Sequence, residues 1–124
     1  MPNPMIESHK NLIVWQKSMD LVESVYGITE KFPSKEQFGL ISQMRRAAVS
    51  IPSNIAEGYG RHASGSYIQF LSIARGSLLE LETQIELSIR LKYFNECESE
   101  KIFSDIIEIS KMLTSLISKI GNRQ

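Results

Sequence analysis

Side chains that could do chemistry are few in this sequence, and their spacing does not assemble a catalytic site. His9 and His62 are the two histidines, and neither follows a glutamate by three residues, the spacing that di-iron helical bundles use. Cys97 is the single cysteine, with no second thiol for a zinc site or a disulfide and no adjacent cation to activate it. No serine has a histidine at a spacing typical of nucleophilic catalysis. We therefore expect no catalysis, no metal and no cofactor.

Glycine and basic residues offer a second kind of chemistry, the binding of phosphate groups. Gly58, Tyr59 and Gly60 follow a predicted helix instead of a strand, so they match neither a Walker loop nor a dinucleotide-binding loop. The local concentration of basic residues around this stretch remains a candidate for contact with a nucleic acid. The candidate residues are Arg45, Arg46, Arg61, His62 and Arg75.

A strip of polar side chains is predicted along one side of the helix that contains the first of these arginines. Turning each residue by ~100° places the strip opposite an apolar stripe that runs from Met44 to Ile55. Serine and asparagine are mediocre helix formers, and a strip that faces only solvent more often carries lysine and glutamate. We interpret the strip as a structural polar network or a subunit contact, with plain solvent-exposed surface and a ligand or RNA contact as the alternatives. Its proposed members are Arg46, Ser50, Asn54 and Glu57.

Amphipathic helices are needed to position these residues, and the apolar pattern predicts four of them. Apolar residues recur at alternating steps of four and three within 12–32, 35–58 and 66–92, and again between the turn at 93–95 and Gly121. The short connections imply that neighbouring helices are antiparallel. The sequence therefore predicts an all-α, antiparallel up-and-down four-helix bundle over residues 11–121, preceded by a flexible N-terminal arm at 1–10.

The helix ends are predicted from capping residues and from residues that break helices. Pro33 ends the first helix, because proline disfavours the helical conformation of the residue before it. Gly76 and Ser77, midway along the third helix, are small enough to let a neighbouring helix approach closely. The predicted caps are Asn11 for the first helix, Ser34 with Gln37 for the second, Ser66 with Gln69 for the third and Asn95 with Glu98 for the fourth.

Pro52 lies in the middle of the predicted second helix. It lacks the amide that would bond to the carbonyl of Ala48, and its ring crowds that carbonyl. The apolar stripe keeps its phase from Met44 through Ile55, which favours one bent helix. A break into two helices is the alternative.

Two apolar stripes share the predicted first helix. A helix that is apolar over so wide an arc is usually covered from two sides. The pattern therefore indicates self-association, and the alternative is that both stripes lie within the core of one monomer. One stripe consists of Val14, Leu21, Val25, Ile28 and Phe32, and the other of Leu12, Trp15, Met19, Val22 and Tyr26.

Length and charge narrow the class of protein. A chain of 124 residues suits one domain. Its 14 basic and 14 acidic residues give a net charge of zero, whereas most nucleic-acid binders have an excess of basic residues. The N-terminus has no apolar core of a signal peptide, and the longest aliphatic or aromatic run is 12–15. We expect a cytoplasmic protein with no membrane association.

Four segments carry a resemblance that covers most of the chain, from about 11 to 120. The sequence resembles the bacterial family of ribosomal-RNA intervening-sequence proteins, which are four-helix bundles encoded within intervening sequences of 23S ribosomal RNA genes. Several motifs in the same order make the resemblance specific. The segments are LIVWQK at 12–17, FGLISQMRRAA at 38–48, SIPSNIAEG at 50–58 and ARGSLLELE at 74–82.

The resemblance implies a partner and an assembly as well as a fold. A related protein, the accessory variability determinant of diversity-generating retroelements, is a pentamer that binds a reverse transcriptase and nucleic acid. By resemblance we expect a homopentamer and a non-catalytic adaptor for RNA or a nucleoprotein. This chain departs from that relative in charge, which is strongly basic there and zero here. A purely protein-binding scaffold is therefore the main alternative, and a nuclease acting on the intervening RNA is the third.

Overall fold

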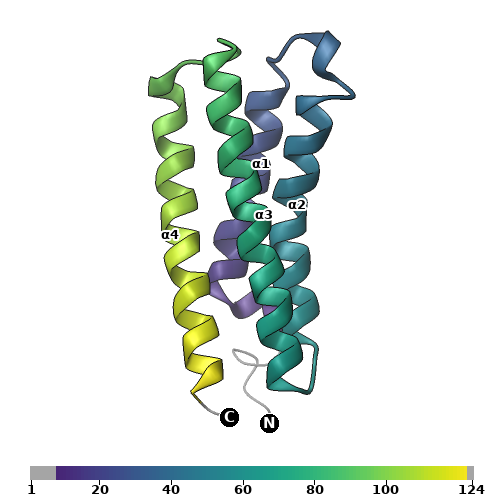
Figure 1. Cartoon of the computed structure of the whole chain (residues 1–124), viewed down its shortest axis with the longest axis vertical. Helices are drawn as coiled ribbons and strands as arrows, with labels where there is room; N and C mark the ends of the chain where they lie inside the picture. The colour runs from purple at the N-terminus through teal and green to yellow at the C-terminus, as the bar shows by residue number, and fades with distance from the viewer. Residues whose placement is uncertain (1–7, 123–124) are drawn as a thin grey trace.

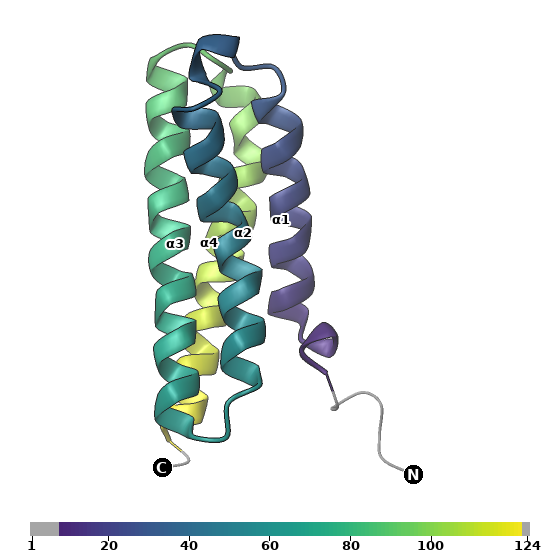
Figure 2. The ribbon, with the colours of Figure 1, turned by 90° about the vertical axis from the view of Figure 1, so that its right-hand side faces the viewer.

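Four long antiparallel helices form the part of the chain that the computed structural model describes, residues 8–122 (Figure 1). Each helix packs against the helices before and after it in the chain, and α1 also packs against α4, so the bundle is closed (Figure 2). The predicted all-α four-helix fold is confirmed, and residues 8–122 contain no strand. The elements are η2 (His9–Asn11), α1 (Ile13–Thr29), η3 (Ser34–Glu36), α2 (Leu40–Tyr59), α3 (Ser64–Arg90) and α4 (Glu96–Gly121), where η marks a short 3-10 turn.

The core is built from the apolar stripe of each helix. Leu21, Ile51, Leu78 and Ile109, one from each helix, are at most 1% exposed. Fully burying an aliphatic side chain of this size stabilises the fold by ~1.5–3 kcal/mol. The four stripes predicted from the spacing of apolar residues are therefore what holds the helices together.

Buried hydroxyl groups in this core bond to the backbone of their own helix. Ser18 donates to the carbonyl of Val14 at 2.7 Å, and Ser88 donates to the carbonyl of Gln84 at 2.8 Å. A hydroxyl that donates a hydrogen bond to the carbonyl four residues earlier in its own helix needs no partner from another helix. The hydroxyls of Ser18 and Ser88 are thus satisfied mainly by the backbone of their own helices, and Ser88 Oγ also lies 3.5 Å from Met44 Sδ on α2.

Pro52 lies inside α2, which runs without a break from Leu40 to Tyr59. The prediction of one continuous helix is confirmed, and the alternative of two helices is wrong. Pro52 is itself buried next to Ile51 and close in sequence to Ile55, which are both 0% exposed. The packing of this face keeps the helix continuous even though the carbonyl of Ala48 lacks its amide partner.

The start of α2 differs from the prediction. Ser34 and Gln37 do not form a capping box, and the helix begins at Leu40 instead of 35. Residues Ser34–Glu36 make a 3-10 turn, and the backbone of Gly39 (φ −107°, ψ −115°) separates this turn from the helix. The carboxylate of Glu36 performs the capping, because its Oε1 accepts the amide of Leu40 at 3.2 Å.

Two other predicted caps are wrong, and one is confirmed. Asn11 belongs to the 3-10 turn η2, so Leu12 precedes α1 and provides no side-chain cap. Ser66 lies inside α3, which begins two residues earlier after Ala63. Asn95 and Glu98 form the predicted capping box of α4, with the Glu98 amide donating to Asn95 Oδ1 at 2.7 Å.

The remaining boundaries shift by a few residues. The first helix ends at Thr29 instead of reaching 32, although Phe32 is still buried in the turn that follows. The third helix ends at Arg90, and Lys92 then adopts the left-handed conformation with φ 66°. Of the predicted arm at 1–10, residues 1–7 lie outside the described residues, and His9–Asn11 form η2.

Candidate functional site

The polar strip of α2 divides into two parts that face different surroundings. Ser50 and Asn54 are half-buried and turn toward α3, whereas Arg46, Ser53 and Glu57 are exposed. The sequence predicted one network from Arg46, Ser50, Asn54 and Glu57. The structure brings together only Ser50 and Asn54 of these four.

A hydroxyl pair joins α2 to α3 at the half-buried part of the strip. The Oγ atoms of Ser50 and Ser77 lie 2.8 Å apart, and either hydroxyl can be the donor. Asn54 Nδ2 donates to Ser50 Oγ at 2.9 Å and to the Ser50 carbonyl at 2.8 Å. This arrangement satisfies the serine and asparagine within the protein and fixes the position of α3 beside α2. Ser77 was predicted as a small contact residue, but its partner in α2 could not be identified from spacing.

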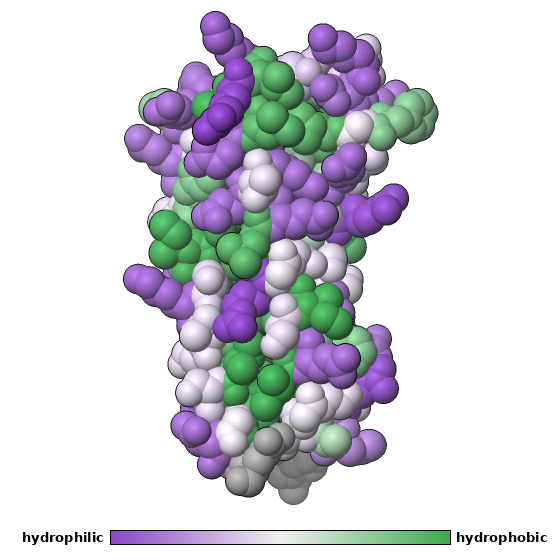
Figure 3. Space-filling view, viewed as in Figure 1, coloured by the Kyte–Doolittle hydropathy of each residue, from purple (hydrophilic) through white to green (hydrophobic). Residues whose placement is uncertain are grey.

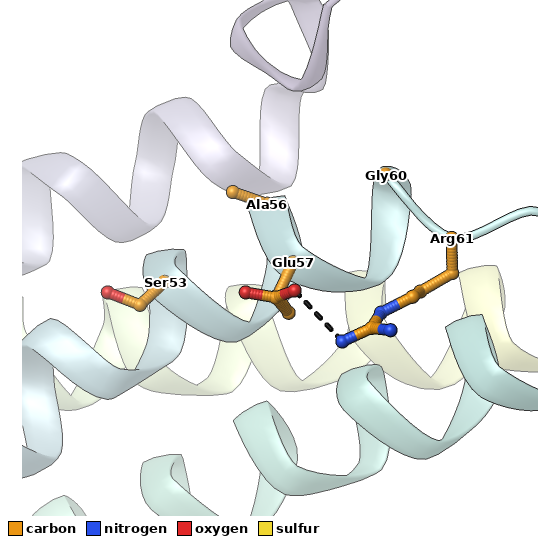
Figure 4. A pocket seen from close by; sticks show the side chains of 5 residues that line it. All are labelled: Ser53, Ala56, Glu57, Gly60 and Arg61. Carbon is orange, nitrogen blue, oxygen red and sulfur yellow. Dashed lines mark hydrogen bonds and ion pairs between the residues drawn. The ribbon is translucent and has the colours of Figure 1, made fainter.

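A shallow hollow lies at the C-terminal end of α2 and contains Ser53 and Glu57 of the exposed part of the strip. Its lining includes Ser53, Ala56, Glu57, Gly60 and Arg61 (Figure 4). Arg61 Nη2 lies 3.0 Å from Glu57 Oε2. The two opposite charges in the hollow therefore pair with each other, so the hollow itself carries no net charge for an anionic ligand.

The guanidinium of Arg61 also has an apolar neighbour. It lies 4.7 Å from the ring centroid of Phe70 on α3, within the range of a cation–π contact. Arg61 therefore helps to hold the turn between α2 and α3 against the bundle.

Arg45 links α2 to the last turn of α1. Its Nε donates to Thr29 Oγ1 at 2.9 Å, and its Nη2 lies 3.4 Å from the Tyr26 carbonyl. The guanidinium also lies 4.4 Å from the Tyr26 ring centroid. A cation at the C-terminal end of a helix is stabilised by the helix dipole. The role that the structure gives Arg45 is therefore to join two helices.

The other predicted basic residues are dispersed over the bundle. Arg75 donates to Thr114 on α4 at 3.3 Å. Arg46 and His62 are exposed, and the side chain of neither has a hydrogen bond or ion pair to another residue of the described chain. At a rise of 1.5 Å per helical residue, Arg45 is about 21 Å from Tyr59, the last residue of α2, and Arg61 lies beyond that end. The five candidates thus do not form one basic patch, and their contact with RNA stays a prediction.

Acidic side chains lie mainly on the surfaces of α1, α3 and α4. Lys17 Nζ lies 2.7 Å from Glu108 Oε1, and this hydrogen bond raises the pKa of the Lys17 ammonium. Lys101 Nζ lies 3.0 Å from Asp105 Oδ2. Within residues 8–122, no three or more His, Cys, Asp and Glu side chains come together in a way that could hold a metal ion.

The turn before α2 is attached to the turn before α4. Tyr93 Oη donates to Glu36 Oε2 at 2.7 Å, while the other carboxylate oxygen accepts the Leu40 amide. The hydrogen bond from Tyr93 and, to a smaller extent, the one from the Leu40 amide lower the pKa of the Glu36 carboxyl below its usual 4.5. The same carboxylate raises the pKa of the Tyr93 hydroxyl. Sequence reasoning missed this link, because its partners are separated by 57 residues.

Large apolar side chains are exposed along α1 and α2. The second stripe of α1 is partly covered, but Met19 and Tyr26 are 40% and 42% exposed. Phe38, just before α2, is 90% exposed, and Val49 is 40% exposed. Three of these residues, Tyr26, Phe38 and Val49, border a groove. This α1–α2 groove has a lining that includes Tyr26, Phe38, Ile41, Arg45, Arg46 and Val49.

The face of the bundle that has α3 in the middle, between α4 and α2, carries apolar patches separated by polar residues (Figure 3). A second groove lies between the end of α3 and the start of α4. The half-buried side chains of Ile89 and Phe103 provide its apolar part, and three exposed carboxylates surround them. This α3–α4 groove is lined by Glu86, Ile89, Glu96, Ser99, Glu100 and Phe103.

None of the helices within residues 8–122 combines the length and the apolar character that crossing a bilayer requires. The exposed apolar residues are distributed as separate surface patches along amphipathic helices. They are the features of this surface that best fit contact with another protein.

Comparison with known proteins identifies relatives of the same fold. A family model described as 23S rRNA-intervening sequence protein matches residues 10–115, which include all of α1, α2 and α3 and most of α4. A crystal structure of a protein of unknown function, from the S23 ribosomal protein family of Bacteroides thetaiotaomicron, is similar at 30% sequence identity. The similarity covers 85% of this chain and 98% of that chain, with a TM-score of 0.76. No curated protein sequence matches the chain.

Proposed function

The chain belongs to the 23S rRNA-intervening sequence protein family, and from this premise we propose that it is a non-catalytic helical adaptor that binds copies of itself and a nucleoprotein partner. By resemblance to the family, the proposed assembly is a homopentamer in the cytoplasm. The proposed contact with the nucleoprotein is made to its protein component.

The observation that carries this proposal is the contrast between apolar and basic side chains on the surface. Phe38, Met19 and Val49 are substantially exposed along the α1–α2 side. In contrast, Arg45 and Arg61 are used for contacts within the bundle. Aromatic and other large apolar side chains are enriched where proteins bind one another. The surface therefore supports protein contact better than contact with a phosphate backbone.

The names of the family and of the similar structure suggest where the protein acts. The family is named after the intervening sequence of 23S rRNA, and the similar structure belongs to a ribosomal protein family. We accordingly propose that the protein partner is one that is itself bound to ribosomal RNA. Direct RNA binding is the second candidate, because Arg46 is exposed and forms no bond to another described residue.

The test separates the two partners. The full chain, immobilised, is mixed with a lysate of the source cell before and after ribonuclease treatment, and captured proteins are identified. We expect one protein or a small set to be retained after ribonuclease treatment. Independently, binding to 23S rRNA fragments is measured over a series of salt concentrations, and we expect no binding that weakens steeply with salt.

A matched pair of variants completes the test. Arg46→Ala removes the exposed arginine of α2, and Arg90→Ala removes an exposed arginine at the end of α3 as the control. Salt-dependent RNA binding that is lost in Arg46→Ala and kept in Arg90→Ala would replace the protein-contact proposal with direct RNA contact. Cleavage of the RNA by the purified chain would contradict the non-catalytic role.

A further inference from the structure

The α1–α2 groove and the α3–α4 groove lie on opposite sides of the bundle. The packing order places α1 beside α2 and α4, and α3 beside the same two helices, so the two pairs face away from each other. The turn before α2 and the first turn of α4 lie at the same end of the molecule (Figure 1). The two grooves are therefore at a similar level along the bundle axis.

The two grooves have complementary chemistry. Phe38, at 90% exposure, projects from the edge of the α1–α2 groove, and the exposed guanidinium of Arg46 lies on the same groove. The α3–α4 groove contains the half-buried apolar side chains of Ile89 and Phe103. Its lining has three exposed carboxylates and no cation: Glu86, Glu96 and Glu100.

Phe38 is presented on a turn that is held from both sides. Glu36, two residues earlier, accepts the Tyr93 hydroxyl, and it also accepts the amide of Leu40, two residues later. The exposure of the ring is thus a property of a fixed turn. Because the backbone of the turn is already fixed, less conformational entropy is lost when the Phe38 ring enters a partner.

We propose that the occupant of each groove is a second copy of this chain, with Phe38 and Arg46 of one copy docked in the α3–α4 groove of the next. Phe38 packs on Ile89 and Phe103 of the neighbour, and Arg46 faces the neighbour's carboxylates. The contact is heterologous, because it joins two different surfaces. Copies therefore lie side by side with the same orientation, and the assembly closes into a ring when the rotation from one copy to the next allows it. The inference rests on the self-association in the proposed function and adds the surfaces and the direction of the contact.

Charge favours a second copy over an unlike partner. The whole chain has 14 basic and 14 acidic residues, yet the two grooves have opposite character. A contact between two α1–α2 grooves across a two-fold axis would place arginines of both copies close together, which is unfavourable. The head-to-tail contact instead places a cation against carboxylates and an aromatic ring against an apolar floor.

The test uses two variants of the full chain, each with one damaged surface. The first carries Phe38→Ala with Arg46→Ala, and the second carries Glu86→Lys with Glu100→Lys. Sedimentation velocity measures the assembly of each variant, and of the two mixed in equal amounts. We expect each variant alone to associate at least about ten-fold more weakly than the unmodified chain. The mixture should form a dimer that grows no further, because each variant keeps the surface that the other lacks.

Ile73→Ala, an exposed apolar residue of α3 outside both grooves, is the matched control and should assemble like the unmodified chain. Circular dichroism confirms that all variants remain helical. Self-association of the unmodified chain that both damaged variants retain would overturn this contact and leave the self-association of the proposed function standing. A second variant that assembles normally while the first does not would also overturn it. A monomeric unmodified chain at all accessible concentrations would overturn both proposals.

Discussion

Gly58 determines how closely the end of α2 can approach α3. A Cβ atom at this position would lie 2.9 Å from Phe70 Cβ, 3.0 Å from Tyr67 Cδ1 and 3.2 Å from the Tyr67 carbonyl oxygen. Real Cβ atoms do not approach other heavy atoms so closely. The absence of a side chain at Gly58 therefore permits the helix contact.

Replacing Gly58 with alanine tests this close approach. Alanine favours a helix over glycine by ~0.5–1 kcal/mol, but overpacking costs ~1–3 kcal/mol, and we expect the overpacking to dominate. Gly58→Ala should thus lower the free energy of unfolding in urea by about 1 kcal/mol or more. Gly76→Ala is the control, since nothing lies within 4 Å of its Cβ position, and it should raise the free energy of unfolding. Stabilisation by both substitutions would disprove the close-packing role.

Gly58 and Gly76 also show how much of a single residue's structural role can be predicted from the sequence. Gly76 was predicted to permit close helix packing, and this is wrong, because it is exposed on the outer side of α3. Gly58 was interpreted only as the start of a turn. Glycine has no side chain to mark a face, so its role depends on which helix lies opposite. The sequence does not contain that information locally.

At the scale of secondary-structure elements, Glu36 joins three parts of the chain. It caps α2 through the Leu40 amide and binds the hydroxyl of Tyr93 in the turn between α3 and α4. Phe32, after α1, lies beside the Tyr93 ring, with centroids 5.3 Å apart. One end of the bundle is therefore tied together by a carboxylate whose pKa is below its usual value.

This link predicts a dependence of stability on pH. A carboxyl group with a lowered pKa in the folded state stabilises the fold above its unfolded pKa, and the contribution is lost as the pH falls through the folded pKa. Tyr93→Phe should therefore lower the melting temperature at neutral pH. It should have little effect in acid well below the carboxyl's usual pKa of 4.5.

Thermal unfolding monitored by circular dichroism over that pH range measures the effect. Tyr26→Phe is the control, because its hydroxyl forms no hydrogen bond to another described residue and α1 keeps its other contacts. An equal loss of stability by Tyr93→Phe at neutral and acidic pH would mean that the hydroxyl bond to the Glu36 carboxylate does not contribute.

Helices were more predictable than their ends. The number and type of the helices follow from apolar stripes that are many residues long. A single residue that departs from the pattern does not obscure such a stripe. The capping box of α4 was found because both partners, Asn95 and Glu98, are local. The start of α2 was misplaced because Glu36 acts with Tyr93, which is distant in the sequence. Ser66 has the spacing of a cap, but α3 begins two residues before it, at Ser64.

At the scale of the whole molecule, α1 differs from the other helices in its length. It has 17 residues, compared with 20, 27 and 26 for α2, α3 and α4. One of its two apolar stripes is partly exposed, as Met19 and Tyr26 show. Because α1 is short and part of its apolar surface is exposed, we expect it to open locally at a lower free energy than α2 and α3.

Hydrogen exchange measured by mass spectrometry tests this difference. At low protein concentration, we expect amides of α1 to exchange about ten-fold faster than those of the central turns of α2 and α3, a difference of ~1.4 kcal/mol in opening free energy. At high concentration, α1 should become more protected if copies associate through the α1–α2 groove. Equal protection of all four helices at low concentration would contradict the expectation.

The surfaces of the whole molecule were the least predictable feature. The second stripe of α1 indicated that something covers it, and the structure leaves Met19 and Tyr26 partly exposed. Phe38 was assigned to the second helix, since the helix was predicted to begin at 35, and its exposure was missed. The five basic candidates were close in sequence or in predicted helix position, yet a long helix separates Arg45 from Arg61.

The start of the described chain, at η2, and its finish, at the last turn of α4, lie at the end of the bundle away from Phe38 and from the first turn of α4 (Figure 1). Dyes or affinity tags attached near either point would therefore be remote from the grooves in question. In a side-by-side array with uniform orientation, all such labels would gather on one rim. Energy transfer between them would then report assembly without obstructing it.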